Sequence, residues 1–170
     1  MLFQGLSLAL ASGEALHVAG PNGVGKSSLL RLLAGLSRPW SGTVTHEGAV
    51  GLMDERPALD PDAPLGRALA FWERIDTPTE DATSRMGLSD LLDVPVRYLS
   101  TGQKKRAALA RLIGQGAPIW LLDEPFNALD RDAVSLLERL VARHCAEGGI
   151  AIIASHQPFA LEQMHRLDLA

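Results

Sequence analysis

Apolar residues along this chain fall into short continuous runs that alternate with longer runs of helical spacing. The short runs at residues 15–19, 119–122 and 149–154 are almost wholly apolar, which is typical of strands buried on both faces of a parallel sheet. The longer runs predict helices at residues 28–34, 65–75, 84–92, 102–114 and 132–146. This alternation predicts an α/β fold with a mostly parallel sheet and helices on both of its faces.

The middle of the chain carries the pattern of an insertion. Residues 43–45 and 50–53 flank Glu47 and Gly48, which predicts a β-hairpin. Residues 54–64 are rich in Asp and Pro and mark a boundary, after which the chain is helical. We therefore expect one domain over residues 1–170, in which residues 1–61 and 116–170 form the core and residues 62–115 form an inserted helical subdomain.

Residues 20–27 read Gly-Pro-Asn-Gly-Val-Gly-Lys-Ser, which is the pattern of a phosphate-binding loop. The glycines let backbone N–H groups surround an anion, Lys26 adds a positive charge, and the Ser27 hydroxyl can bind Mg²⁺. A strand precedes this loop and a helix follows it, so the positive end of the helix dipole faces the phosphates. The alternative is a glycine-rich turn with a surface lysine. The residues assigned to the nucleotide here are Gly20, Pro21, Asn22, Gly23, Val24, Gly25, Lys26, Ser27 and Ser28.

Two carboxylates follow the apolar run at residues 119–122. A buried strand brings Asp123 to the carboxyl edge of the sheet, where the phosphate loop also lies, so Asp123 can hold Mg²⁺ beside Ser27. Glu124 is placed to accept a proton from an attacking water, a role that contributes about 10²- to 10⁴-fold in rate. Without the phosphate loop, the same residues would be consistent with an acidic turn at a strand end.

A third motif lies between these two, at residues 99–103, which read Leu-Ser-Thr-Gly-Gln. Ser100 has the character of a helix N-cap, and the small residues after it leave room for a phosphate at the helix N-terminus. Taken alone, the motif would also be consistent with a capped helix that binds nothing.

These motifs, in this order, resemble those of the ATP-binding-cassette (ABC) ATPases over essentially the whole chain. Residues 128–130 match the D-loop of that family, and Ser155-His156 matches its switch histidine. The resemblance implies a P-loop NTPase fold with an inserted helical subdomain of the ABC type, and ATP and Mg²⁺ as ligands. It also implies that a second copy of the chain completes each ATP site.

The resemblance assigns a role to each matching residue. Ser100, Gly102 and Gln103 of one copy would cap the γ-phosphate that is bound by the other, with Thr101 in place of a glycine. Glu124 and His156 would be catalytic, with His156 contacting the γ-phosphate. Ser27 and Asp123 would hold the metal.

Several strings are similar to one branch of the family, the ATPase subunits of cytochrome c maturation, traditionally called haem exporters. They are residues 35–39, 102–112, 121–126 and 148–157, among which Phe126 and Gln157 are the most telling. This branch implies an ATPase that energises an integral membrane permease subunit, for haem export or for release of a haem chaperone. Such a subunit would be peripheral, bound at the cytoplasmic face of the inner membrane.

Composition narrows the choice of partners. The net charge of −4 gives no basic field that would indicate nucleic acid. Cys145 is the single cysteine, which excludes an internal disulfide and fits a reducing compartment. No apolar stretch approaches the roughly 18–20 residues that span a bilayer, so we expect no direct membrane insertion.

Two departures from the family keep other functions open. Arg56 stands where the family has a glutamine that links the metal site to the transporter, and Phe3 is a poor counterpart of the aromatic that stacks on adenine. These departures are also consistent with a nucleotide-binding module that no longer turns over usefully, or with the ATPase of another ABC transporter. ABC ATPases of chromosome maintenance are disfavoured, because residues 62–115 are too few for their long coiled coil.

Overall fold

The computed structural model describes residues 3–54, 56–76, 82–159, 161 and 164–169. In these residues the strands form one sheet of order β2-β3-β4-β1-β5, in which every neighbouring pair is parallel. The strands are β1 (Ala15–Ala19), β2 (Val50–Met53), β3 (Ile119–Asp123), β4 (Ile150–Ser155) and β5 (His165–Asp168). The helices are α1 (Lys26–Leu33), α2 (Leu65–Glu73), α3 (Ala82–Arg85), α4 (Thr101–Gly114) and α5 (Arg131–Ala146), with short 3₁₀ turns at Ser89–Leu91 and Val96–Tyr98. The predicted α/β fold with a parallel sheet is confirmed.

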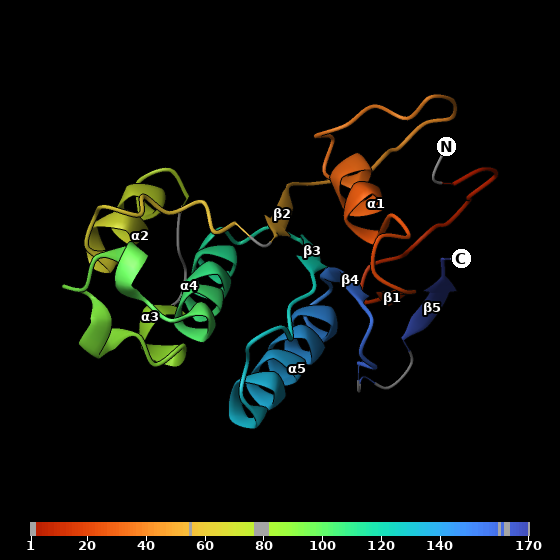
Figure 1. Ribbon diagram of the computed structural model, residues 1–170. Coiled ribbons are helices and arrows are strands. Elements are labelled where there is room, and N and C mark those ends of the chain that lie inside the picture. Colours follow the sequence, from red (N-terminus) through yellow and green to blue (C-terminus); the bar gives the residue numbers. More distant parts are fainter. Residues whose placement is uncertain (1–2, 55, 77–81, 160, 162–163, 170) are drawn as a thin grey trace.

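Helices cover both faces of the sheet, with α1 on one face and α5 on the other (Figure 1). All residues of β1 and β3 are buried, because a strand in the middle of such a sheet has helices above and below it. Successive side chains of β1 point to opposite faces of the sheet. Leu16 and Val18 pack with Leu30 of α1, whereas Ala15 belongs to the cluster that contains Val141 of α5.

Helices α2, α3 and α4 lie together on the far side of β2 from α1 (Figure 1). Leu65, Leu88 and Leu112 are fully buried among them. The guanidinium of Arg111 lies 3.9 Å from the centre of the Trp72 ring, and burial lowers the pKa of Arg111. The helices predicted at residues 65–75 and 102–114 correspond to α2 and α4. Within the described chain, none of the helices is both long enough and apolar enough to cross a bilayer.

Two expectations from the sequence differ from the structure, and one strand was not expected. The hairpin at residues 43–53 is wrong: residues 43–45 are exposed and outside any strand, because β2 pairs instead with the buried β3. The single helix at residues 84–92 is also wrong, since α3 ends at Arg85 and Gly87 takes a left-handed conformation (φ 61°). Strand β5 was not predicted, because its exposed His-Arg-Leu-Asp sequence lacks the apolar run of the inner strands.

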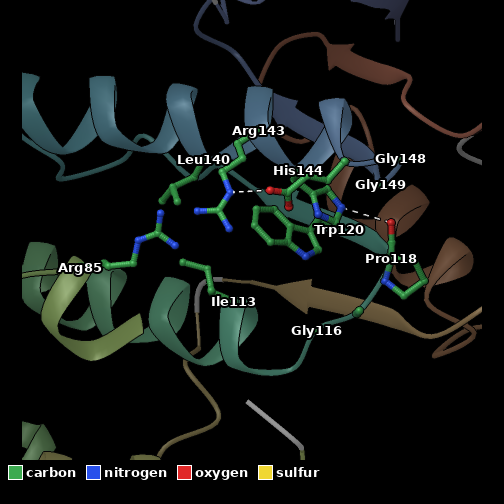
Figure 2. A pocket seen from close by; sticks show the side chains of 12 residues that line it. Arg85, Ile113, Gly116, Pro118, Trp120, Leu140, Arg143, His144, Gly148 and Gly149 are labelled. Atoms are coloured by element: carbon green, nitrogen blue, oxygen red, sulfur yellow. Dashed lines mark hydrogen bonds and ion pairs between the residues drawn. The ribbon is translucent and has the colours of Figure 1, made fainter. Parts of the chain in front are cut away.

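An aromatic stack joins α5 to the start of β3 (Figure 2). Since the phosphate loop follows the last residue of β1 and the strands are parallel, the stack lies at the opposite end of the strands. The rings of Trp120 and His144 lie 3.9 Å apart and nearly parallel, at 9°. The Nε2–H of His144 donates to the carbonyl of Pro118 at 3.2 Å, and burial lowers the pKa of His144, so the ring is neutral at pH 7. Gly149 lies directly against this ring and leaves no room for a Cβ atom.

This contact generates a stability prediction. The substitution Gly149→Ala would push a methyl group into the His144 ring and displace it from Trp120, so it should lower the free energy of unfolding by about 1–3 kcal/mol. Urea titration of the purified chain measures this effect. In a His144→Ala background the same substitution should be nearly neutral. An equal loss in both backgrounds would contradict the steric explanation.

Candidate functional site

The phosphate loop runs from the end of β1 into the first turn of α1. Gly25 is the N-cap residue of α1 in a left-handed conformation (φ 112°), and no side chain caps the helix. The first N–H groups of α1 are therefore not satisfied by a cap and remain available to an anion. The predicted loop residues lie around them: Pro21, Asn22, Gly23 and Ser27 are exposed, and Gly20, Val24, Gly25 and Ser28 are partly buried.

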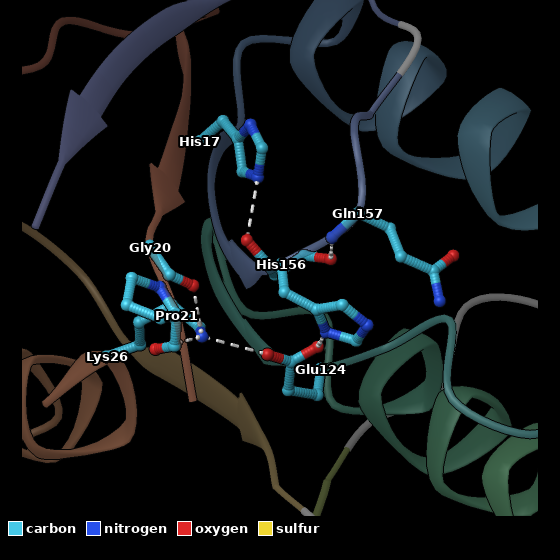
Figure 3. Close-up of polar contacts among 8 residues, drawn as sticks. His17, Gly20, Pro21, Lys26, Glu124, His156 and Gln157 are labelled. Atoms are coloured by element: carbon cyan, nitrogen blue, oxygen red, sulfur yellow. Dashed lines mark hydrogen bonds and ion pairs between the residues drawn. The ribbon is translucent and has the colours of Figure 1, made fainter. Parts of the chain in front are cut away.

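Lys26 is the buried member of the loop, with 5% of its surface exposed. Its ammonium donates to the carbonyls of Gly20 at 2.9 Å and Pro21 at 3.2 Å. It also forms an ion pair with Glu124, with 3.1 Å between Nζ and Oε1 (Figure 3). The ammonium thus sits at the mouth of the loop with a carboxylate as its counter-ion.

Glu124 joins Lys26 of the phosphate loop to His156, which follows β4. Its other carboxylate oxygen, Oε2, accepts a hydrogen bond from Nδ1–H of His156 at 2.9 Å (Figure 3). Glu124 is 8% exposed, whereas the side chain of His156 is 42% exposed. The sequence predicts that these groups lie at the carboxyl ends of the strands. In the structure Glu124 is in direct contact with both Lys26 and His156.

The backbone at Glu124 explains how its side chain reaches the loop. Glu124 follows the last residue of β3 and adopts φ 43°, a left-handed conformation that is uncommon outside glycine. Its N–H donates to the carbonyl of Ala154 in β4 at 2.8 Å, which fixes this turn. Such strain is found at functional sites, where the surrounding structure holds it in place.

The residues expected to hold a metal are Asp123 and Ser27. Asp123 ends β3 and is 6% exposed, and Ser27 is exposed in the first turn of α1, which packs on β3. A hydroxyl and one carboxylate are oxygen ligands that suit Mg²⁺, which takes its remaining ligands from water and phosphate. No group of three or more His, Cys, Asp or Glu side chains in the described part of the chain forms a metal site.

The third motif lies at the N-terminus of α4, away from α1 (Figure 1). Ser100 and Gln103 form a capping box: Ser100 Oγ accepts from the N–H of Gln103 at 3.2 Å, and Ser100 N–H donates to the Gln103 side chain at 2.8 Å. Among the described residues, the Ser100 hydroxyl is found only as an acceptor, so its hydrogen can be donated to a ligand. A cavity of about 360 Å³ lies between this helix start and residues 128–133.

Gly102 packs directly on the D-loop of the same chain. A Cβ atom at Gly102 would lie 2.8 Å from the carbonyl oxygen of Ala128, which itself has φ 65°. Next to it, Asp130 caps α5 by accepting from the N–H of Ala133 at 2.8 Å. The signature residues are therefore placed beside the D-loop, whereas the cluster of Lys26, Glu124 and His156 lies elsewhere in the chain.

The structure also places the two residues that depart from the family. The N–H of Arg56 donates to Asp54 at 2.9 Å, and the Asp54 carboxylate lies 3.9 Å from Arg31 of α1. Asp54 thus ties the segment after β2 to the helix that follows the phosphate loop, which sequence reasoning missed. Phe3 packs against the apolar cluster on the α1 face of the sheet, which is the position of a core residue.

The fold and this cluster together define a P-loop nucleotide-binding domain. The family model of the ABC transporter matches residues 3–127. The protein named "Cytochrome c biogenesis ATP-binding export protein CcmA" in Novosphingobium aromaticivorans is 57% identical over 169 residues, which cover 99% of this chain and 88% of that protein. The protein of the same name in Sphingopyxis alaskensis is 52% identical over 171 residues, with 98% and 88% covered.

Comparison of structures gives the same family. A metal-chelate type ABC transporter in an inward-facing conformation matches with a TM-score of 0.82 and 26% identity, over 98% of this chain and 73% of that one. This chain belongs to the ABC transporter family, and it is an ATPase of that family. The resemblance inferred from the motifs is thereby confirmed.

Proposed function

We propose that this chain is the ATP-hydrolysing subunit of an ABC transporter complex that serves c-type cytochrome biogenesis. The observation that carries the catalytic part is the Glu124 carboxylate, which contacts both Lys26 and His156. The 57% identity to a cytochrome c biogenesis ATP-binding export protein supports the biological role. The chain's own residues would bind the nucleotide, activate water and transmit the result to a membrane partner.

ATP would enter the loop by replacing the contacts of Lys26. The β- and γ-phosphates take the place of the carboxylate and the loop carbonyls at the ammonium, while the free N–H groups of α1 bind phosphate oxygens. A phosphate carries more charge than Glu124, so the exchange favours the nucleotide. Ser27 and Asp123 would hold Mg²⁺, which supplies charge neutralisation at the phosphates when bound.

Glu124 would then be released to act on water. Its carboxylate accepts a proton from the water whose oxygen attacks the γ-phosphorus, and the bond to the β–γ bridging oxygen breaks to leave ADP and phosphate. His156 would contact the γ-phosphate by donating a hydrogen bond from a ring N–H. The contact between His156 and Glu124 keeps both groups at one place before the nucleotide arrives.

A second copy of the chain would complete each site. The start of α4, which carries Ser100, Gly102 and Gln103, lies away from α1 of the same chain (Figure 1), which supports the use of these residues against the nucleotide of a partner copy in a head-to-tail dimer. The Ser100 hydroxyl hydrogen suits a γ-phosphate oxygen. Within each chain, residues 62–115 would form the subdomain that carries these groups.

The membrane partner would be an integral permease subunit, bound at the cytoplasmic face of the inner membrane. Loss of the γ-phosphate on hydrolysis would open the dimer and so drive that partner, in haem export or in release of a haem chaperone.

A second candidate is a nucleotide-binding module with little turnover. It is favoured by Arg56, whose backbone is fixed by Asp54 in place of the family's glutamine. Phosphate release measured on the complex separates the two, since sustained ATP-dependent release supports the ATPase and persistent absence supports the module.

The catalytic role of Glu124 generates a prediction. The substitution Glu124→Gln removes the base but keeps the size of the side chain, so ATP should still bind while hydrolysis falls by at least about 10²-fold. Radiolabelled ATP binding and phosphate release, measured on the complex, report the two effects separately. Glu138→Gln, on the remote helix α5, is the matched control and should leave both unchanged. Unaltered turnover in Glu124→Gln would remove Glu124 from this role.

The partner and cargo generate a second prediction. An affinity tag on this chain should isolate a multi-span membrane subunit from detergent-solubilised membranes. ATP should release haem, or a protein that holds haem, from the wild-type complex but not from the Glu124→Gln complex. Haem spectra and mass spectrometry of the released fraction identify the cargo. Release of an unrelated solute instead would assign the chain to another ABC transporter.

A further inference from the structure

An imidazole lies buried in the strand that leads into the phosphate loop. His17 is the polar residue of β1, where every residue is buried, and only 4% of its surface is exposed. A buried polar group without a hydrogen bond destabilises the folded chain. The hydrogen-bond partner of the His17 ring therefore indicates the role of this residue.

That partner is the end of the neighbouring strand. Nε2–H of His17 donates to the backbone carbonyl of Ser155 at 3.1 Å (Figure 3). Because a carbonyl oxygen only accepts, Nε2 carries the hydrogen. In the β1–β4 pairing His17 lies opposite Ile153, so the bond reaches two residues farther along β4, on the same face of the sheet.

Ser155 is the last residue of β4, and His156 follows it. The backbone on the other side of His156 is held as well, because Ser155 Oγ accepts from the N–H of Gln157 at 2.9 Å. Ser155 is fully buried, whereas the His156 side chain is 42% exposed. The position of His156 thus depends on how rigidly the end of β4 is held.

On its other side His17 faces β5. Arg166 is its register partner there, and the guanidinium of Arg166 binds both oxygens of Asp168, at 2.8 Å to Oδ1 and 3.1 Å to Oδ2. The pKa of Asp168 is lowered, chiefly by its side-chain hydrogen bonds with Arg166. The Asp168 carboxylate is thus bound by Arg166, whereas the His17 ring is hydrogen-bonded to the Ser155 carbonyl.

We propose that His17 is a positioning residue for catalysis, which sets the place of His156 by holding the Ser155 carbonyl. The inference rests on the proposed roles of Glu124 and His156. His17 stands three positions before Gly20, so one strand carries both the phosphate loop and the group that holds the switch histidine. This arrangement fixes the distance between the nucleotide and His156 through β1.

The test removes the donor while keeping the volume of the ring. His17→Phe should lower kcat for ATP by about 10- to 100-fold, because displacements near 1 Å at a reacting centre have effects of this size. The Kd for ATP should change less than about twofold, since the loop contacts are untouched. His17→Gln places an amide N–H near the position of Nε2 and should recover most of the activity. The assay uses the complex isolated through a tag on this chain.

His144 provides the matched control, since its Nε2–H also donates to a backbone carbonyl, that of Pro118 (Figure 2), at the opposite end of the strands. His144→Gln should leave kcat unchanged. If His17→Phe does not fold, His17→Asn takes its place, because its shorter amide falls short of Ser155.

His156→Ala separates this inference from the proposed function. Low activity in His156→Ala together with normal activity in His17→Phe overturns the role of His17 alone. Normal activity in His156→Ala overturns the role of the switch histidine itself. When both variants are impaired, combining them should lower kcat little beyond His156→Ala, since both act through one contact. Additive losses, or failure of His17→Gln to recover activity, would overturn the inference.

Discussion

The site is organised by the carboxylate of Glu124, which contacts both an ammonium and an imidazole. Glu124 meets Lys26 at 3.1 Å and His156 at 2.9 Å, and each of the three follows a different strand of the sheet. The parallel order β3-β4-β1 is what makes this possible, because neighbouring parallel strands end at the same edge. A strand running the other way would place its residue at the opposite edge, and the cluster would not form.

The same contact explains how a nucleotide would change the site. In the described structure the ammonium of Lys26 is satisfied by Glu124 and by the loop carbonyls. We propose that phosphate oxygens compete for that ammonium and that their arrival frees the carboxylate to activate water. Binding and catalysis would thus be linked through Lys26. Gly102 at the start of α4 lies against Ala128, and α4 lies away from α1 (Figure 1), so we propose that a second copy completes the site.

Much of this could be predicted from the sequence, for a physical reason. Buried parallel strands are continuous apolar runs, and phosphate chemistry needs glycine, lysine and carboxylate at set spacings, so both leave strong patterns. The hairpin at residues 43–53 was wrong because two apolar segments close in sequence do not reveal that β2 pairs with the distant β3. Strand β5 is an exposed edge strand without an apolar run. The bond from His17 to Ser155 joins residues 138 positions apart, and its only sequence signal is an imidazole within an apolar strand.

Nucleotide binding at this site would depend on Lys26, whose ammonium would exchange the Glu124 carboxylate for the phosphates of ATP. Equilibrium binding of labelled ATP to purified Lys26→Ala tests this dependence. Lys104→Ala, which changes a lysine of α4, is the control. We expect saturable binding by the wild type and by Lys104→Ala, and binding at least about tenfold weaker in Lys26→Ala. Equal affinity in all three proteins would contradict this dependence.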